Sequence, residues 1–120
     1  MAHPNPNSLN TNEALQLWQA ALVNMVRDDR PDLTMRQMAI LMTVYMTPSP
    51  HTVRGLAALL NIAKPAVTRA LDRLGREELI RRKRDDADRR NVLVQRTVQG
   101  ALAVEKLSDA ILGRFRGLPL

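Results

Sequence analysis

The segment TVRGLAALLNIAKPAVTRALDRL, residues 52–74, decides the fold predicted for this chain. Thr52 can cap a helix over VRGLAALLN, because its hydroxyl can accept a hydrogen bond from the first helical turn. A short break follows at residues 61–63. A second helix begins at Lys64, where Pro65 is tolerated because the first helical turn has no N–H partner to lose. The pattern predicts a helix-turn-helix.

Each of these helices has one apolar and one polar face. The expected buried set is Leu56, Ala57, Leu60, Ile62, Val67, Leu71 and Leu74. The expected exposed face of the second helix carries Lys64, Thr68, Arg69, Asp72 and Arg73. An α-helix fits the major groove of DNA, where basic and hydroxyl side chains near its N-terminus can reach base edges. Taken alone, the same face is equally well explained as the charged surface of an αα-hairpin.

A basic hairpin is predicted directly after the second helix. The segments LIRRKR (79–84) and NVLVQR (91–96) resemble two strands, with polar DDADR between them. A flexible basic tip beside a recognition helix can enter the adjacent minor groove, where arginine responds to groove width and potential. We expect Asp88 to orient Arg90, which lies two residues further on. Alternatively, the acids at the tip only offset repulsion among its basic residues.

The distribution of charge supports a polyanion as partner. The chain carries a formal net charge of +6 and has a sequence pI near 11.0. Residues 1–50 have a net charge of −1, residues 51–100 of +6 and residues 101–120 of +1. Such a localised excess is typical of a nucleic-acid binder, although a solvated surface that keeps the protein soluble explains it as well.

Helices are predicted on both sides of this block. The first runs from Thr11 to Val26, and the last begins at Thr97. Both have apolar positions at spacings of three and four, which indicates a helix face that packs against a partner. The residues on these faces are Leu15, Trp18, Leu22 and Met25 in the first helix and Val104, Leu107, Ile111 and Phe115 in the last.

A further helix is predicted from Thr34, which forms a capping-box pattern with Gln37. Its segment MRQMAILMTVYM is apolar on nearly every side and is therefore expected to be buried. Its methionines are interpreted as core residues, and an adaptable ligand-lining surface is the alternative.

The chain resembles the MarR family of bacterial winged-helix transcriptional regulators. The matching segments are LTMRQMAIL, TVRGLAALLNIAKPAVTRALDRL and RRKRDDADRRNVLVQRTVQG, and the Asp-x-Arg pattern of the family falls on Asp88 and Arg90. The resemblance implies a homodimer built from the terminal helices, with one recognition helix in each major groove of double-stranded DNA. It also implies release by a small aromatic or anionic effector bound between the lobes.

The predicted fold class is mainly α with a small β wing, a winged helix-turn-helix with N- and C-terminal dimerisation helices. The predicted domains are a flexible tail (1–10), an N-terminal dimerisation helix (11–30), a DNA-binding winged helix (31–97) and a C-terminal dimerisation helix (98–120). The DNA-binding residues are predicted to be Lys64, Pro65, Ala66, Thr68, Arg69, Arg73, Arg84, Asp88, Arg89 and Arg90. The candidate effector pocket draws on Trp18, Met42 and Tyr45.

Four features depart from the family pattern. Glu78 stands where the family usually has a glycine that ends the recognition helix. We therefore expect the end of this helix to be rebuilt, with Gly75 as the residue that ends it. Ala63 takes the usual capping position, which costs the helix about 1 kcal/mol. Arg96 replaces the usual leucine before Thr97 and adds charge near the wing base. The chain also ends about one helix early, so the predicted dimer interface is smaller or differently arranged.

Several function classes are disfavoured. The chain has no cysteine, which excludes disulfides, thiol switches and Cys-ligated metals. The two histidines, His3 and His51, belong to no catalytic or metal-ligand pattern, so we expect no enzyme activity, cofactor or metal. No apolar run suggests a secretion signal or membrane span, so a cytoplasmic protein is expected. The alternative function is an anti-repressor-like protein-interaction module without its own operator.

Overall fold

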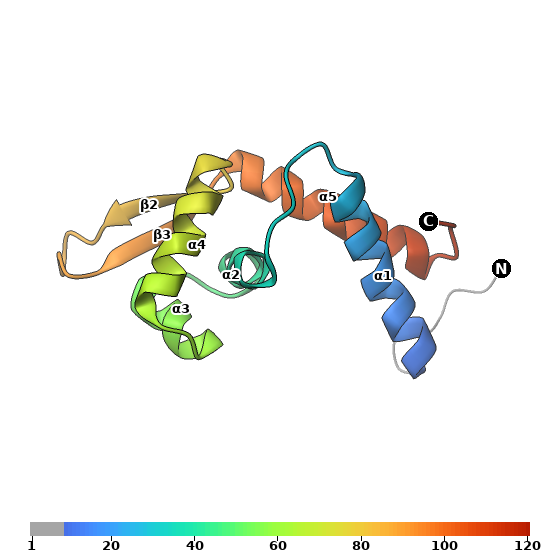
Figure 1. Ribbon diagram of the computed structural model, residues 1–120, viewed down its shortest axis with the longest axis horizontal. Coiled ribbons are helices and arrows are strands. Elements are labelled where there is room, and N and C mark those ends of the chain that lie inside the picture. Colours follow the sequence, from blue (N-terminus) through green and yellow to red (C-terminus); the bar gives the residue numbers. More distant parts are fainter. Residues whose placement is uncertain (1–8) are drawn as a thin grey trace. The chain divides into compact units, whose positions relative to one another are not determined.

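The computed structural model describes residues 9–120 and confirms the predicted fold class, a mainly α winged helix (Figure 1). The helices are α1 (Thr11–Arg27), α2 (Met35–Met46), α3 (Val53–Leu60), α4 (Lys64–Arg76) and α5 (Val98–Phe115). The strands are β1 (His51–Thr52), β2 (Ile80–Arg84) and β3 (Val92–Arg96). The chain forms two compact units, one of residues 33–104 and one that combines the segment up to Asp32 with residues 105–120. The functions predicted for each domain range stay predictions.

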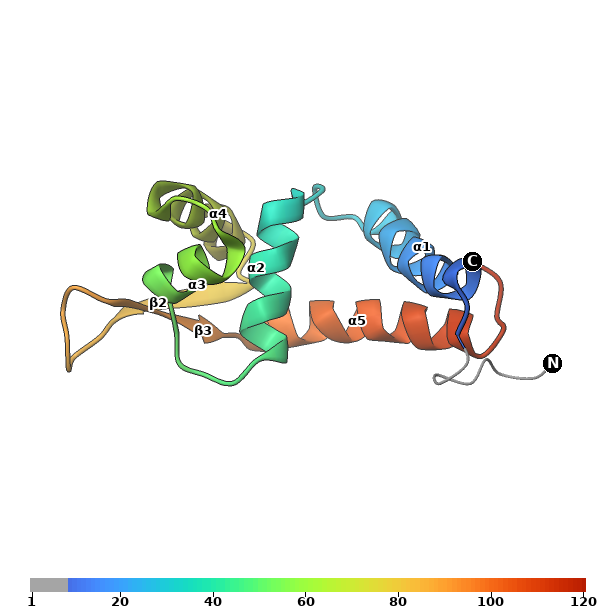
Figure 2. The same ribbon diagram turned by 90° about the horizontal axis from the view of Figure 1, so that it is seen from below.

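The winged-helix unit, residues 33–104, contains an antiparallel sheet in the order β1-β3-β2. The hairpin register pairs Arg82 with Val94 and Lys83 with Leu93. The predicted hairpin is therefore present, but the sequence did not predict β1, which adds His51 and Thr52 to the outer edge of β3. Figure 2 shows α3 and α4 together beside α2, with the hairpin extending away from them.

One apolar core holds this unit together. Its largest fully buried side chains are Ile40, Leu56, Leu71, Leu74, Leu79, Val44 and Val67. Five of the seven residues expected to be buried are so, while Leu60 and Ile62 are only partly buried against the same core. The core therefore fixes α4 by its apolar side and leaves the opposite side of the helix in solvent.

The capping pattern of α2 is confirmed, but its expected burial on all sides is wrong. The Thr34 side chain accepts a hydrogen bond from the N–H of Gln37 at 3.2 Å, and the Gln37 side chain accepts from the N–H of Thr34 at 2.8 Å. Met35 and Met46, at the two ends of the helix, are 73% and 61% exposed. The buried residues of α2 are Ile40, Leu41, Val44 and Tyr45, and Met38 and Met42 pack partly buried against the same core.

The second unit contains α1 and most of α5. Asn10 caps α1 and forms a capping box with Glu13. Ala20 and Ala21 are buried, whereas Leu15, Trp18 and Leu22 remain exposed. No helix within residues 9–120 is long and apolar enough to cross a membrane.

Candidate nucleic-acid interface

Helix α4 presents a polar side with few intramolecular contacts. Val67, Ala70, Leu71 and Leu74 are buried in the core. The side chains on the opposite side are exposed: Lys64, Pro65, Thr68 and Arg69. Ala66, between them, is partly buried. Five of the ten residues predicted to bind DNA thus lie together on the first two turns of one helix, and four of them are exposed.

The start of α4 lacks a side-chain cap, as the sequence indicates. Ala63 occupies the capping position and provides no side-chain acceptor for the first-turn N–H groups. Pro65 removes one of those donors. The positive end of the helix dipole therefore faces solvent beside Lys64, which favours a negatively charged group at this end.

Further along α4, acidic side chains offset two of the basic groups. Nε of Arg73 lies 3.3 Å from a carboxylate oxygen of Glu77, one turn away. Arg82 on β2 forms an ion pair of 2.7 Å with Asp72 and thereby connects the wing to α4. Arg73, predicted to contact phosphate, is therefore half-buried and already paired, whereas Lys64 and Arg69 are exposed.

The exit from α4 corrects one prediction. Glu78 itself adopts the left-handed conformation, with φ of 60°, while Gly75 remains inside the helix. The N–H of Glu78 donates to the carbonyl of Gly75 at 3.0 Å, and the N–H of Leu79 donates to the carbonyl of Leu74 at 2.9 Å. These bonds satisfy the last helical carbonyls, and they hold a non-glycine residue in a conformation that costs roughly 1 kcal/mol.

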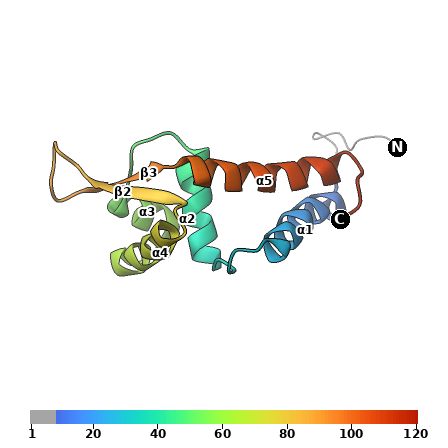
Figure 3. The ribbon, with the colours of Figure 1, turned by 90° about the horizontal axis from the view of Figure 1, so that it is seen from above.

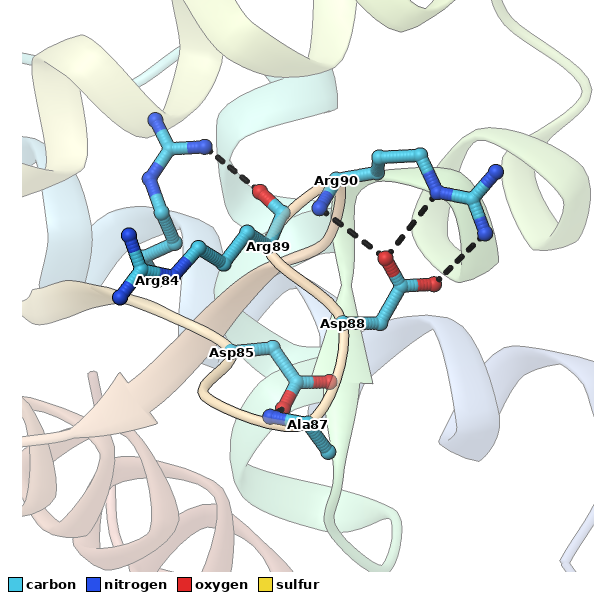
Figure 4. Close-up of polar contacts among 6 residues, drawn as sticks. All are labelled: Arg84, Asp85, Ala87, Asp88, Arg89 and Arg90. Atoms are coloured by element: carbon cyan, nitrogen blue, oxygen red, sulfur yellow. Dashed lines mark hydrogen bonds and ion pairs between the residues drawn. The ribbon is translucent and has the colours of Figure 1, made fainter.

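The tip of the wing is held by bonds within the loop itself (Figure 4). The N–H of Asp85 donates to the carbonyl of Asn91 at 3.1 Å, and the N–H of Asn91 donates to the carbonyl of Asp88 at 2.9 Å. Arg84 donates to the carbonyl of Arg89 at 2.6 Å. These bonds fold the tip into a turn, and Figure 3 shows it at the far end of the β2–β3 hairpin.

Asp88 and Arg90 form the predicted pair. The carboxylate of Asp88 accepts from Nε of Arg90 at 3.1 Å, from Nη2 at 3.2 Å and from the backbone N–H of Arg90 at 3.1 Å. The side-chain bonds from Arg90, then its backbone bond, hold the pKa of Asp88 below its usual range. The Arg90 side chain is 82% exposed, so its guanidinium is oriented yet available to a ligand.

A tyrosine in the core connects the end of α4 with the beginning of α5. The hydroxyl of Tyr45 donates to the carbonyl of Leu79 at 2.7 Å and accepts from the N–H of Thr97 at 3.0 Å. The Thr97 hydroxyl in turn donates to the carbonyl of Glu78 at 2.8 Å and accepts from the N–H of Gly100 at 2.9 Å. We call these side chains, Tyr45 and Thr97, the core hydrogen-bond lock.

Arg96 does more than add charge at the wing base. Its Nε donates to the carbonyl of Val44 at 2.8 Å and its Nη2 to the carbonyl of Thr47 at 3.0 Å. Its guanidinium also lies 5.7 Å from the centre of the Tyr45 ring. Arg96 therefore satisfies carbonyls at the C-terminal end of α2 and fixes the base of β3 against it. The sequence signal was the unusual arginine at this position.

The candidate effector residues are not brought together within one unit. Tyr45 is 9% exposed and its hydroxyl is committed to the lock, so it is a structural core residue. Met42 is partly buried against the same core. Trp18 is exposed on α1 in the other unit.

The residues predicted to form the dimer have different surroundings. Leu15, Trp18 and Leu22 are exposed, at 59%, 46% and 37%, and Met25 is partly buried. On α5, Val104 belongs to the core of the winged-helix unit, Leu107 is buried, and Ile111 and Phe115 are partly buried. Among the eight residues predicted to form the dimer, the exposed ones are therefore all on α1.

Within the described residues, no group of three or more His, Asp or Glu side chains could hold a metal ion. The ring nitrogen Nε2 of His51 lies 3.1 Å from the carbonyl of Thr47, which gives this histidine a local structural contact.

Comparison with known proteins provides an independent view. The sequence model of the MarR family matches residues 33–92. No curated protein sequence matches significantly. Three similar solved structures are the transcriptional regulator Tm0710 from Thermotoga maritima, MepR of S. aureus in complex with DNA, and a single-site mutant of MarR from E. coli.

The similarity extends over most of each structure. For Tm0710 the identity is 25%, the match covers 90% of this chain and 78% of that chain, and the TM-score is 0.67. For MepR the identity is 24%, the match covers 87% of this chain and 82% of that chain, and the TM-score is 0.74. For the MarR mutant the identity is 22%, the match covers 89% of this chain and 79% of that chain, and the TM-score is 0.64.

Proposed function

The chain belongs to the MarR family of transcriptional regulators, and we propose that it binds duplex DNA with α4 in the major groove and the tip of the β2–β3 wing in the minor groove. The observation that carries this proposal is the pairing of two basic features in one unit. The exposed side of α4 carries Lys64 and Arg69, and the wing carries Arg90 in a fixed orientation beside Asp88. No catalytic step is assigned to the chain.

The residues of α4 have graded roles in this proposal. Lys64, Thr68 and Arg69 contact base edges, because they are exposed on the first two turns and such side chains donate to groove atoms. Pro65 and Ala66 add little bulk beside the uncapped N-terminus, which allows the DNA backbone to approach. Arg73 contacts phosphate while sharing its charge with Glu77.

The wing residues divide between positioning and contact. Arg90 enters the minor groove, where the negative potential attracts guanidinium groups. Asp88 orients it through the two side-chain bonds. Arg84 supports the tip through the carbonyl of Arg89, and both are exposed to nearby phosphates.

We further propose a homodimer formed through the exposed apolar side of α1. Leu15, Trp18 and Leu22 support it, since apolar side chains at this spacing form a continuous face that gains free energy when buried. A two-fold dimer places two recognition helices about one helical turn of DNA apart. The proposed location is the cytoplasm, where a bacterial regulator meets chromosomal DNA.

Regulation by a small aromatic or anionic effector is part of the proposal only through family membership. Of the residues predicted to line a pocket for it, Tyr45 cannot offer its hydroxyl, which is already bonded to Leu79 and Thr97.

The experiment that tests this function is a selection of genomic DNA fragments by the purified protein. We expect enrichment of an imperfect palindrome whose half-sites lie about 10 bp apart from centre to centre. Recovery of fragments with no shared sequence would contradict sequence-specific binding. The absence of any enriched DNA, together with a recovered protein partner, would favour the anti-repressor-like interaction module instead.

A further inference from the structure

The unit formed by α1 and the C-terminal segment contains a cavity that shares no residue with the proposed DNA contacts. Its volume is about 250 Å³. Its lining is partly aliphatic, including Val23, Leu118 and Leu120, and partly charged, with Arg27, Asp109 and Arg114. The cavity therefore combines an apolar wall with two guanidinium groups and one side-chain carboxylate.

Arg114 is the group in this cavity with unmet bonding capacity. Its Nη2 donates to the side-chain oxygen of Gln16 at 3.1 Å, and its Nη1 lies 3.4 Å from the carbonyl of Leu118. Nε is buried, and no described residue accepts its hydrogen. No carboxylate within residues 9–120 lies within ion-pair distance of this guanidinium, although Asp109 lines the same cavity.

This arrangement is suited to an anion. A guanidinium has five N–H donors in a planar fork that matches a carboxylate. Neutral oxygens already hold two arms of Arg114, so its orientation is fixed before any ligand binds. A half-buried charge that contacts only neutral acceptors is costly, and an added carboxylate would reduce that cost.

The cavity and the exposed apolar side of α1 are on different sides of the helix. At 3.6 residues per turn, the mean direction of the cavity residues Val23, Asn24 and Arg27 lies roughly 150° from that of Leu15, Trp18 and Leu22. Burial of that exposed side of α1 would therefore not by itself cover the cavity residues of α1.

We propose that this cavity binds a small aliphatic monocarboxylate, with its carboxylate on Arg114 and its hydrocarbon chain against Val23, Leu118 and Leu120. Arg27 adds a second positive charge at the site. The carboxylate of Asp109 competes with that of the ligand for the positively charged groups. The proposal goes beyond DNA binding and does not depend on it.

The test is a titration of the isotope-labelled protein, without DNA, with hexanoate and with hexanamide as the neutral probe of equal length. Hexanoate should shift the Nε–H resonance of Arg114 and the amide resonances of Val23 and Gly113 in a saturable way. Hexanamide should bind at least about tenfold more weakly, because it lacks the charge-assisted bonds to the guanidinium.

Three variants make the assignment specific. Arg114→Gln should weaken hexanoate binding about tenfold or more. Asp109→Asn should tighten it, because the competing carboxylate is removed while the fold around Arg114 is left unchanged. Arg116→Gln is the matched control, since Arg116 is exposed on the same segment but does not line the cavity.

Equal affinity for the two probes would overturn the proposal, as would an absence of shifts with hexanoate. Unchanged binding by the folded Arg114→Gln protein, or no tightening with Asp109→Asn, would also overturn it. Each of these results is independent of whether the protein selects an operator.

Discussion

Replacing Gly100 with alanine should destabilise the winged-helix unit by about 3 kcal/mol. A methyl group at this position would collide with the hydroxyl of Tyr45 and with the backbone carbonyl of Leu79. These two atoms form the central bond of the core hydrogen-bond lock, at 2.7 Å. The backbone carbonyl cannot rotate away, so the lock must open and leave a buried hydroxyl without its partner.

The measurement is urea unfolding together with hydrogen exchange of the Leu79 amide, which donates to the carbonyl of Leu74. Gly113→Ala is the control in the same helix. Its new methyl would lie 3.7 Å from Cδ1 of Leu118, which is ordinary contact, and should stabilise the helix by up to about 1 kcal/mol. Wild-type protection of Leu79 in Gly100→Ala would show that the lock does not hold the exit of α4.

Replacing Arg90 with alanine should weaken operator binding by about tenfold to a hundredfold, corresponding to a contact of about 1–3 kcal/mol. The guanidinium is 82% exposed and oriented by Asp88, so little conformational freedom is lost when DNA binds. If Arg90 also replaces a counterion at a phosphate, the slope of log affinity against log salt should flatten by about 0.9. Fluorescence anisotropy at several salt concentrations measures both effects.

The contribution of Asp88 can be separated by a double-mutant cycle. Asp88→Asn should weaken binding in the wild-type background and have no further effect in Arg90→Ala, because the two residues act as one unit.

Bonds from Arg90 lower the pKa of Asp88, so the carboxylate remains charged above the usual Asp range. The pair is lost only as pH falls through this lowered value, and operator affinity should not titrate with Asp88 between about pH 6 and pH 8. Unchanged affinity and slope in Arg90→Ala would disprove the wing assignment.

The features that could be predicted from the sequence are local ones. The caps at Thr34 and Thr52 depend on bonds across three residues. The Asp88–Arg90 pair spans only two. The amphipathic pattern of α4 identified its buried side, because a helix has a fixed period. In each case the partners are close in sequence, so the spacing alone limits the geometry.

The features that escaped prediction depend on residues far apart in the chain. Tyr45 and Thr97 are separated by 52 positions, as are Val44 and Arg96. The strand at His51 exists only because β3 supplies its pairing partner. Glu78 keeps a positive φ because Thr97 and the helix-ending bonds fix its carbonyl and amide groups. No spacing rule expresses these contacts.

The surroundings of the two flanking helices could be predicted only in part. The period of α1 predicted an apolar face, and Leu15, Trp18 and Leu22 are exposed on it. The same reasoning grouped Val104 with Leu107 on α5, but the core of the winged-helix unit takes up Val104. A shared helical face indicates a partner without indicating which one. The dimer therefore stays a proposal that rests chiefly on α1.

The central claim is that α4 and the wing together read duplex DNA, and the most direct test compares two duplexes. The affinity for a selected operator and for a scrambled duplex of equal length should be measured for wild type, Arg69→Ala and the control Arg116→Ala. We predict that wild type and the control prefer the operator, and that Arg69→Ala loses about tenfold or more of this preference while retaining most of its affinity for the scrambled duplex. Equal wild-type affinity for both duplexes, or an unchanged preference in Arg69→Ala, would contradict the account.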